Sequence, residues 1–292
     1  MPSRIIISAD DFGISKGITC SILSCCDRGV VNNVSLVPNG YAYDFALEEY
    51  KKRPGLGLSV HLNLLEGRPL CAPGQVPLLV DSSGLFNRSF SGLFLSYFTL
   101  TKEMQDMLRQ QVRLEIRAQI NKVAESLGSA ENLCINSHRY LHMIPFIFSV
   151  VSELRTETGF SRIRVPVEPF FFSWGGLRTF QNYLGSNMIK HVLINALSRR
   201  LHADSSVPYC TYTVGLFGAG RMAETAIQSA LLRIQNINAD ASVEIIFHPG
   251  RALSDESTIW AEEKICGDFY YSDYRAAEQE ILMSPSFKEM VS

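Results

Sequence analysis

The stretch IIISADDFG, from Ile5 to Gly13, decides the fold class of this chain. Its opening residues are apolar and β-branched, which is typical of a strand, and we expect that strand to cover Arg4–Ser8. Two adjacent carboxylates, Asp10 and Asp11, follow directly, and a helical pattern comes next. A strand that ends in polar residues and leads into a helix is the repeating unit of parallel α/β proteins.

The same unit recurs along the chain. Seven strands are predicted, over Arg4–Ser8, Val30–Val37, Gly57–His61, Asn132–Asn136, Ser161–Val165, Tyr209–Gly215 and Val243–Phe247. Strands interleaved with helices predict a parallel α/β fold, either a barrel or a doubly wound sheet. The clearest helix is expected over Glu103–Leu127, because its apolar residues form one stripe at helical spacing and Gly128 stands where a glycine ends a helix.

Two segments, at about residues 65–100 and 169–203, are predicted to be insertions, because they are rich in glycine, serine and aromatic residues. Both follow a strand end. Loops at that place in a parallel α/β fold lie over the carboxyl ends of the strands, where sites form. The chain has neither a repeat of fixed period nor a low-complexity linker. We therefore expect residues 1–292 to fold as a single domain.

The composition of the 292 residues, with 46% apolar and 19% charged side chains, is that of a globular protein and excludes disorder and coiled coil. The net charge of −2 argues against a nucleic-acid-binding protein, which would carry a basic excess. The longest uncharged stretch, Ser205–Gly220, is shorter than a membrane span, and we expect no signal peptide. The seven cysteines form no CxxC pair, so we expect free thiols and a cytoplasmic location.

Polar side chains gather where several of the predicted strands end. Four of the six histidines lie at such places together with the aspartate pair, and the full set is Asp10, Asp11, His61, His138, His142 and His248. Two histidines and a carboxylate from separate strands suit a divalent metal with open coordination positions. Such a metal activates water and polarises a carbonyl oxygen. One aspartate would bind the metal while its neighbour takes a proton from the attacking water, and a further histidine would protonate the leaving group.

Several motifs in order give a resemblance to a known family. The segments ADDFG (9–13), GLSVHLNL (57–64) and EGRPL (66–70) resemble the YdjC-like carbohydrate deacetylases. The segments NSHRYLH (136–142), RVPVE (164–168), HPG (248–250) and YRAAE (274–278) follow in the family's order. The resemblance extends from about Arg4 to Leu282. It implies a distorted (β/α) barrel and the metal-dependent hydrolysis of an N-acetyl group on a sugar.

The resemblance also implies roles for individual residues. Asp11, His61 and His138 would bind one divalent metal ion, Mg²⁺ or Zn²⁺. Asp10 would be the general base toward the attacking water, and His248 the general acid toward the leaving amine. The residues expected to bind substrate are Arg164, His142, Asn63 and Glu168. The implied partners are an N-acetylated mono- or oligosaccharide, free or linked to a carrier, and a second copy of the chain in a homodimer.

Two positions depart from the family's pattern. Asn136 stands where the family has an aspartate, which removes a carboxylate that could support a metal ligand. Tyr140 replaces an imidazole for which the family suggests a substrate contact. The alternative function is therefore a catalytically altered carbohydrate-binding protein on the same fold. A third hypothesis, hydrolysis of another bond such as a phosphoester, is weakened because no basic cluster surrounds the motifs.

Two aromatic runs and two further histidines allow more than one interpretation. Phe170–Trp174 would either stack on a sugar ring or bury a loop or dimer contact. Phe90–Leu100 is predicted to be core packing rather than a lid or a surface that meets a lipid-linked substrate. His191 and His202 lie in a partly basic helical stretch and are predicted to be exposed.

Overall fold

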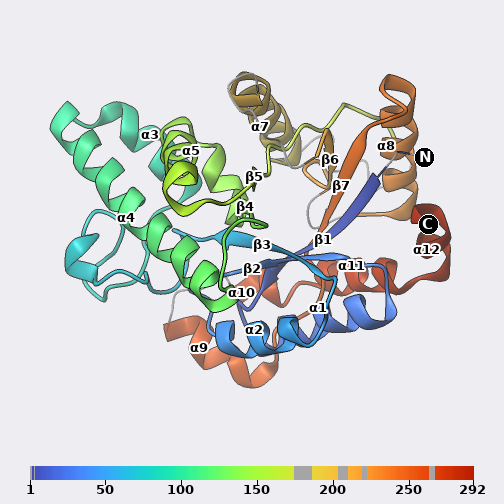
Figure 1. The fold of residues 1–292 in the computed structure, drawn as a ribbon, viewed down its shortest axis with the longest axis horizontal. Helices are drawn as coiled ribbons and strands as arrows, with labels where there is room; N and C mark the ends of the chain where they lie inside the picture. The colour runs from blue at the N-terminus through green and yellow to red at the C-terminus, as the bar shows by residue number, and fades with distance from the viewer. Residues whose placement is uncertain (1, 3, 174–185, 203–209, 219–221, 263–266) are drawn as a thin grey trace.

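The computed structural model describes residues 2, 4–173, 186–202, 210–218, 222–262 and 267–292. Its centre is one sheet of seven parallel strands in the order β5-β4-β3-β2-β1-β7-β6 (Figure 1). The strands are β1 (Arg4–Phe12), β2 (Asn33–Leu36), β3 (Gly57–Leu62), β4 (Cys134–Ser137), β5 (Arg162–Ile163), β6 (Tyr212–Val214) and β7 (Ser242–Phe247). The predicted parallel α/β fold with seven strands is thus confirmed.

The sheet curls until its two outer strands approach each other, which favours the distorted barrel over a doubly wound sheet. After β5 the chain runs on beside β6, where the Thr213 N–H donates to the Val167 carbonyl oxygen over 2.8 Å. The next side chain, Glu168, accepts N–H bonds from Gly215 and Phe217 at the end of β6. One backbone bond and one carboxylate therefore connect the two outer strands of the sheet.

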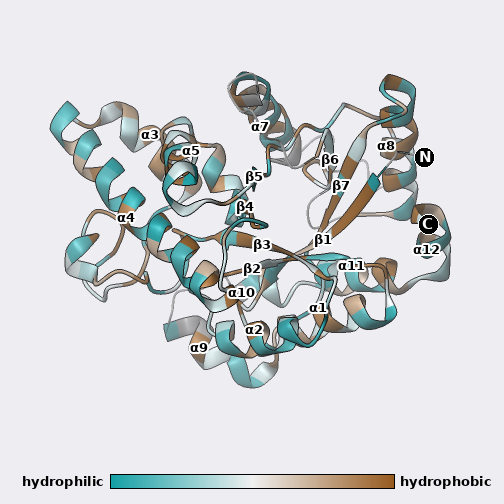
Figure 2. Cartoon of the chain, in the orientation of Figure 1, coloured by the Kyte–Doolittle hydropathy of each residue, from teal (hydrophilic) through white to brown (hydrophobic). Residues whose placement is uncertain are grey.

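Helices cover the outside of the sheet (Figure 1). The longer ones are α1 (Lys16–Arg28), α2 (Tyr43–Lys51), α3 (Phe90–Thr99), α4 (Lys102–Leu127), α5 (Pro145–Thr158), α7 (Ser186–His202), α8 (Glu224–Ile237), α11 (Asp273–Met283) and α12 (Pro285–Val291). The short ones are η1 (Pro73–Gln75), η2 (His138–Met143), η3 (Ser254–Glu256), α9 (Ser257–Glu262) and α10 (Gly267–Tyr270). Apolar residues of the strands, brown in Figure 2, form the buried core with the inner faces of these helices. None of the described helices is long and apolar enough to span a bilayer.

All seven predicted strands are present, and the largest shift of a single strand end is at the end of β1. It continues through the aspartate pair to Phe12 instead of ending at Ser8. Its pairing with β2 shifts register between Ala9 and Phe12, where Asp11 has a left-handed backbone with φ of 69°. Such an irregularity re-aims the side chains of a strand end. Asp10 and Asp11 therefore reach different partners although they are neighbours in the chain.

Helix α4 confirms the predicted amphipathic helix, and Gly128 ends it in the left-handed conformation with φ of 80°. The buried face of α4 also carries polar side chains that hold the first inserted segment. Glu115 accepts two backbone N–H groups of that segment, and Gln111 accepts a third. These bonds satisfy polar groups that would otherwise be buried without partners. They fix the segment along α4.

Helix α3 carries the first aromatic run. Leu93 is buried, and the ring of Tyr97 stacks on that of Phe146 with centroids 4.2 Å apart. Leu95 and Phe98 on the same helix are more than half exposed. The prediction of core packing is therefore confirmed for one face of α3 and does not describe the other.

Of the second inserted segment, the structure describes residues 169–173 and helix α7, while Trp174 lies outside the described residues. Phe171 is buried, whereas Phe170 and Phe172 are more than half exposed. An exposed ring can stack on a sugar or contact another protein. Both interpretations of this aromatic run therefore stay open.

Candidate metal centre and active site

Asp11, His61 and His138 lie together where β1, β3 and β4 end, and all three side chains are buried. One donor atom from each residue lies within 4.8 Å of the other two. Asp11 Oδ1 is 3.2 Å from His138 Nδ1 and 3.6 Å from His61 Nε2. Donors about 2.1 Å from a tetrahedral metal ion lie about 3.4 Å apart. These three residues can therefore surround one divalent cation.

The hydrogen bonds of His61 leave the nitrogen that faces Asp11 without a proton. His61 Nδ1 lies 2.7 Å from Asn136 Oδ1, and an amide oxygen only accepts, so Nδ1–H is the donor. Nε2 is then a buried lone pair that has no hydrogen-bond partner among the described residues. Burial lowers the pKa of His61, which favours this neutral form. A neutral ring whose other nitrogen is anchored is the usual state of a metal-binding histidine.

Asn136 therefore keeps the orienting contact that an aspartate would make at this position. Its Nδ2 donates to Ser35 Oγ over 2.9 Å, and the Ser35 hydroxyl donates to Asp10 Oδ1 over 2.6 Å. The amide orients His61 without adding a negative charge, whereas a carboxylate would also make the ring more basic. The departure from the family pattern changes the charge beside His61, a candidate ligand, while His61 keeps an orienting hydrogen bond.

Glu66 is a site residue that sequence reasoning missed, although it opens the EGRPL segment soon after β3. Its Oε1 lies 3.6 Å from His138 Nε2, and its oxygens accept bonds from Arg139 Nη2 and the Tyr270 hydroxyl, each over 3.0 Å. Burial alone would lower the pKa of His138, but the Glu66 and Asp11 carboxylates outweigh it and raise the pKa to about 9. The negative charge that retains this proton would equally attract a cation.

Asp11 is held at its other oxygen by Arg275 of α11, and we call these two residues the rim pair. Arg275 Nη1 lies 2.7 Å from Asp11 Oδ2. The fully buried guanidinium also donates to the carbonyl oxygens of Pro249 and Gly250, which follow β7. Burial disfavours the charged form of Asp11, but the His138 bond and the Arg275 charge outweigh it and hold the pKa of Asp11 well below its usual range.

Asp10 contacts a different arginine inside the barrel. Arg164 Nη1 and Nη2 reach its two oxygens over 2.7 and 3.0 Å, and the same guanidinium donates to Glu244 of β7 over 2.6 and 3.0 Å. We call Asp10, Arg164 and Glu244 the interior ion cluster. Burial would raise the pKa of Asp10, but the Arg164 charge outweighs it and holds that pKa well below its usual range. Asp10 is therefore ionised at neutral pH, with Oδ2 3.9 Å from His61 Nδ1.

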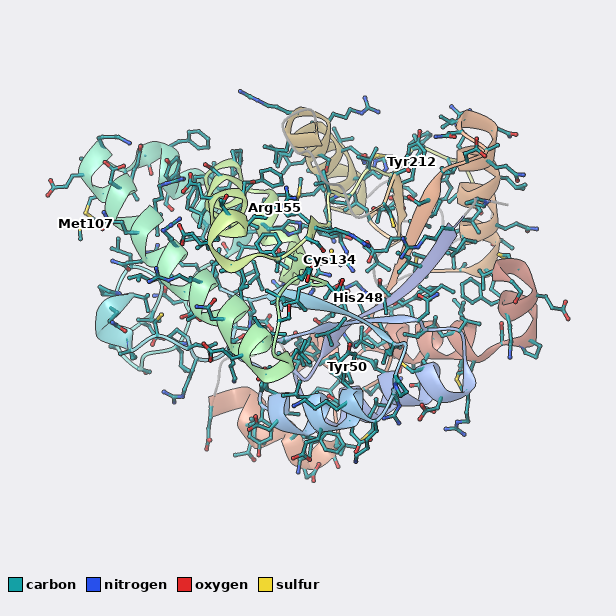
Figure 3. All side chains as sticks on the ribbon, in the orientation of Figure 1. Tyr50, Met107, Cys134, Arg155, Tyr212 and His248 are labelled. Atoms are coloured by element: carbon teal, nitrogen blue, oxygen red, sulfur yellow. The ribbon has the colours of Figure 1, made fainter. Side chains whose placement is uncertain are left out.

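His248 follows β7 and lies in the middle of the molecule in Figure 3. The Glu278 carboxylate of α11 accepts its backbone N–H over 2.6 Å and lies 4.0 Å from the ring Nδ1. Nδ1 is buried and makes no hydrogen bond within the described parts of the chain. Burial lowers the pKa of His248 to about 4, even though the Asp11 and Asp10 charges act in the opposite direction. The imidazole is therefore neutral at pH 7.

The residues expected to bind substrate are buried and contact the protein itself. Asn63 Oδ1 accepts two backbone N–H groups of the turn that places Glu66. His142 is bonded at both ring nitrogens, to Ser137 Oγ over 2.6 Å and to the Arg164 carbonyl oxygen over 2.7 Å. Burial lowers the pKa of His142 to about 4. Substrate binding by Asn63, His142 and Arg164 stays a prediction.

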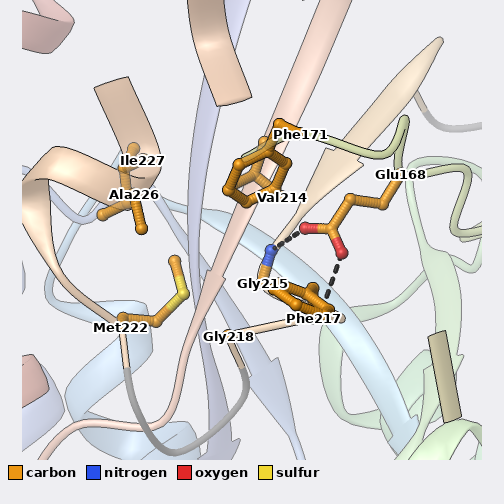
Figure 4. Close-up of a pocket in the computed structure, with 9 residues that line it drawn as sticks. All are labelled: Glu168, Phe171, Val214, Gly215, Phe217, Gly218, Met222, Ala226 and Ile227. Carbon is orange, nitrogen blue, oxygen red and sulfur yellow. Dashed lines mark hydrogen bonds between the residues drawn. The ribbon is translucent and has the colours of Figure 1, made fainter. Parts of the chain in front are cut away.

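Glu168, the fourth of these residues, lines a small, mostly apolar pocket beside β6 (Figure 4). Its carboxylate accepts the N–H groups of Gly215 and Phe217 over 2.7 and 2.6 Å. Burial raises the pKa of Glu168 to about 7, although these bonds favour its charged form. The contacts make Glu168 part of the barrel closure, and its role toward substrate stays a prediction.

His191 on α7 is buried, so the prediction that it is exposed is wrong. Its Nε2 lies 3.1 Å from the Glu168 carbonyl oxygen, and its ring packs edge-on against Phe217. The basic residues of this helical stretch predicted that its side chains face solvent. The chain after β5 covers the side of the helix that carries His191. The side chain of His202 lies outside the described part of the structure.

The fold and the site together give the class of this protein: it is a parallel α/β barrel with a candidate Asp/His/His metal site at its strand ends. Within that class the chain belongs to the YdjC-like protein family, whose model matches residues 4–292. The resemblance drawn from the motifs is thereby confirmed.

Curated relatives and a solved structure extend this comparison. The chain is 29% identical over 209 residues to a chitooligosaccharide deacetylase of Escherichia fergusonii, which covers 70% of this chain and 77% of that protein. It is 26% identical to a carbohydrate deacetylase of Brevibacillus brevis, over 99% and 94% of the two chains. A carbohydrate deacetylase of Listeria monocytogenes is 34% identical, over 54% of this chain and 59% of that protein.

The fold also matches a crystal structure from Enterococcus faecalis V583, described provisionally as a cellobiose-phosphate cleavage protein. The TM-score is 0.67 and the sequence identity 22%, over all of this chain and 94% of the other. At this identity the likeness shows the shared fold.

Proposed function

We propose that this protein is a divalent-metal-dependent hydrolase that removes acetate from an N-acetylated sugar. The observation that carries the proposal is the convergence of Asp11, His61 and His138 donor atoms beside an ionised Asp10. The names of the relatives, which are carbohydrate and chitooligosaccharide deacetylases, support the substrate class. The substrate is a mono- or oligosaccharide, either free or attached to a carrier.

The metal site would be formed by Asp11, His61 and His138. A divalent cation bound there, Mg²⁺ or Zn²⁺, supplies a Lewis acid that polarises the acetyl carbonyl and lowers the pKa of water. The protein's own part is to hold the donors in place, through Asn136 on His61 and Arg275 on Asp11. Anchored donors keep the geometry of a metal site fixed.

Asp10 is proposed as the general base. Arg164 and Ser35 hold its carboxylate in one orientation, and its low pKa keeps it ionised at neutral pH, which is the form that can accept a proton from the attacking water. His248 is proposed to give a proton to the leaving amine. Because its ring is neutral at pH 7 in the resting enzyme, this donation requires that His248 first gains a proton during the reaction.

The remaining proposed residues act around the reacting groups. We infer that Arg164 and His142 position the base, since His142 holds the Arg164 carbonyl oxygen while the Arg164 guanidinium holds Asp10. Asn63 and Glu168 are proposed to contribute to the sugar site by shaping the loops after β3 and β5. A cytoplasmic location is supported by the free thiols of the described cysteines.

A homodimer is also proposed, and gel filtration of the purified protein is the measurement that tests it.

The alternative, a carbohydrate-binding protein with altered catalysis, rested on Asn136 and Tyr140. The contact between Asn136 and His61 weakens it, because the ligand histidine is still oriented by this side chain. The two functions differ in turnover and in sensitivity to a chelator.

The test is acetate release from a panel of N-acetylated sugars, with added Mg²⁺ or Zn²⁺ and again in EDTA. We expect release that EDTA abolishes and added metal restores. Asp10→Asn should reduce turnover by about a thousandfold, within the range of general base catalysis. His61→Ala should reduce turnover and metal binding together. The exposed carboxylate variant Asp106→Asn is the matched control and should retain wild-type turnover.

Wild-type turnover in both Asp10→Asn and His61→Ala would exclude this mechanism. Sugar binding that ignores EDTA, with no acetate released from any substrate, would favour the binding protein instead.

A further inference from the structure

Tyr140 carries a buried hydroxyl that nothing in the described structure bonds. The residue is 6% exposed, and its Oη has no hydrogen-bond partner among the described residues. A buried hydroxyl without a partner destabilises the folded state, so native proteins rarely retain one unless a ligand, an ion or an ordered water completes it. The same deficiency recurs at His61 Nε2 and His248 Nδ1, two atoms of the candidate active site.

The backbone around Tyr140 is also unusual. Arg139 and Tyr140 both have left-handed conformations, with φ of 52° and 56°, directly after His138. Two successive non-glycine residues in this region are strained, and such strain is concentrated at functional sites. The turn carries Tyr140 two residues past a candidate metal ligand.

The surroundings of the phenol connect it to the site and to α7. The charged groups that act on it include Arg164 and Asp10 of the interior ion cluster, together with Glu168. Lys190 Nζ of α7 lies 4.8 Å from the centroid of the ring. A cation at this distance is attracted to the face of an aromatic ring, so the contact joins Tyr140 to the second inserted segment.

We propose that the Tyr140 hydroxyl is a specificity-determining group that forms a hydrogen bond with the N-acetylated sugar beside the reacting amide. Burial raises the pKa of the Tyr140 phenol above its ordinary value, so the hydroxyl is protonated at neutral pH and can both donate and accept. This inference rests on the proposed deacetylase function.

The test compares wild type with Tyr140→Phe, which removes only the hydroxyl. We expect KM for diacetylchitobiose, or its Kd by calorimetry, to rise about tenfold, as for one lost hydrogen bond. Metal binding should be unchanged. The melting temperature without sugar should stay the same or rise by a few degrees, because the unbonded hydroxyl no longer has to be buried.

Tyr43→Phe is the matched control. Tyr43 is also buried, but its hydroxyl contacts Ser126 Oγ over 3.0 Å on α4. This variant should melt at a lower temperature and retain the wild-type KM. The opposite responses of the two variants separate a binding role from a structural one.

Wild-type KM and Kd in Tyr140→Phe would overturn the inference while acetate release by wild type upholds the proposed function. A weaker sugar affinity accompanied by the same loss of melting temperature as Tyr43→Phe would also overturn it, since the hydroxyl would then be structural. Absence of both acetate release and sugar binding in wild type would overturn the proposed function and the inference together.

Discussion

The interior ion cluster and the rim pair both bind an aspartate of β1 to a buried arginine, but they distribute charge differently. In the interior ion cluster, one guanidinium serves two carboxylates, Asp10 and Glu244. In the rim pair, Arg275 forms an ion pair with one carboxylate among the described residues, that of Asp11, and donates its other N–H groups to backbone carbonyl oxygens. Both oxygens of Asp10 are occupied by Arg164, whereas Asp11 Oδ1 faces the two histidines.

This difference in charge balance gives the neighbouring carboxylates of Asp10 and Asp11 different roles. The interior ion cluster carries one excess negative charge, because its two carboxylates share the single guanidinium of Arg164. The rim pair is neutral, and Asp11 Oδ1, which bonds His138, is the oxygen that would face a cation. A carboxylate becomes a metal ligand or a fixed base according to how many donors compete for its oxygens.

The largest effect is expected for Arg164→Met, which leaves two buried carboxylates without a cation. Removing one partner of a buried ion pair costs about 3–5 kcal/mol, and two unpaired charges should place this variant at about 5 kcal/mol or beyond. Urea denaturation at pH 7.5 measures the loss.

Arg53→Met is the matched control, because Arg53 also contacts two carboxylates, Asp27 and Glu49, at the surface. This variant should lose less than about 1 kcal/mol. Equal losses in the two variants would contradict the role assigned to burial.

Arg275→Met should cost about 3 kcal/mol, because a single buried carboxylate loses its partner. A divalent cation would replace the missing positive charge at Asp11. Saturating Mg²⁺ should therefore raise the melting temperature of Arg275→Met more than that of wild type, whereas Arg164→Met should gain no more than wild type. The measurement is thermal unfolding of the three proteins with Mg²⁺ and with EDTA. The same gain in all three would remove the distinction between the two regions.

A smaller effect of about 2 kcal/mol is expected for His142, whose ring holds the Arg164 carbonyl oxygen. Its pKa of about 4 in the folded protein lies below the value near 6.5 in the unfolded chain. The unfolded state thus binds more protons between these values, and stability falls as the pH falls through this window. From pH 7.5 to 5, wild type should lose about 2 kcal/mol more than His142→Gln in urea denaturation. If the free energy of unfolding falls equally with pH in the two proteins, protonation of His142 does not contribute to the stability of the interior ion cluster.

The sequence predicted those parts of the site that sit on strand ends. His61 and His138 each follow an apolar run, and the rule that parallel strands end on one side brings them near the aspartate pair. Arg275 and Glu278 belong to the YRAAE segment (274–278), but they lie on a helix, so the strand-end rule gave them no role. Their spacing of three residues places both on one helix face, but only the folded chain shows that this face meets β1 and the loop after β7.

Backbone geometry and helix burial were harder to predict. The left-handed turn at Arg139 and Tyr140 occurs at residue types that rarely adopt this conformation, and the aspartate at the bulge in β1 is a weaker signal of it than a glycine would be. His191 was assigned to the surface from the basic residues around it, and its burial depends on the distant chain after β5. The predicted strands β5 and β6 are longer than the observed ones. Their apolar residues continue into the segments beside Glu168 that close the barrel.

The left-handed backbone at Asp11 also limits how this site can evolve. Besides glycine, asparagine and aspartate adopt that conformation most readily, and only aspartate among them carries a charge. Glutamate would keep an anionic oxygen but would strain the end of β1. Single substitutions that change the metal preference of this site are therefore expected at the histidines or their neighbours, while Asp11 is retained.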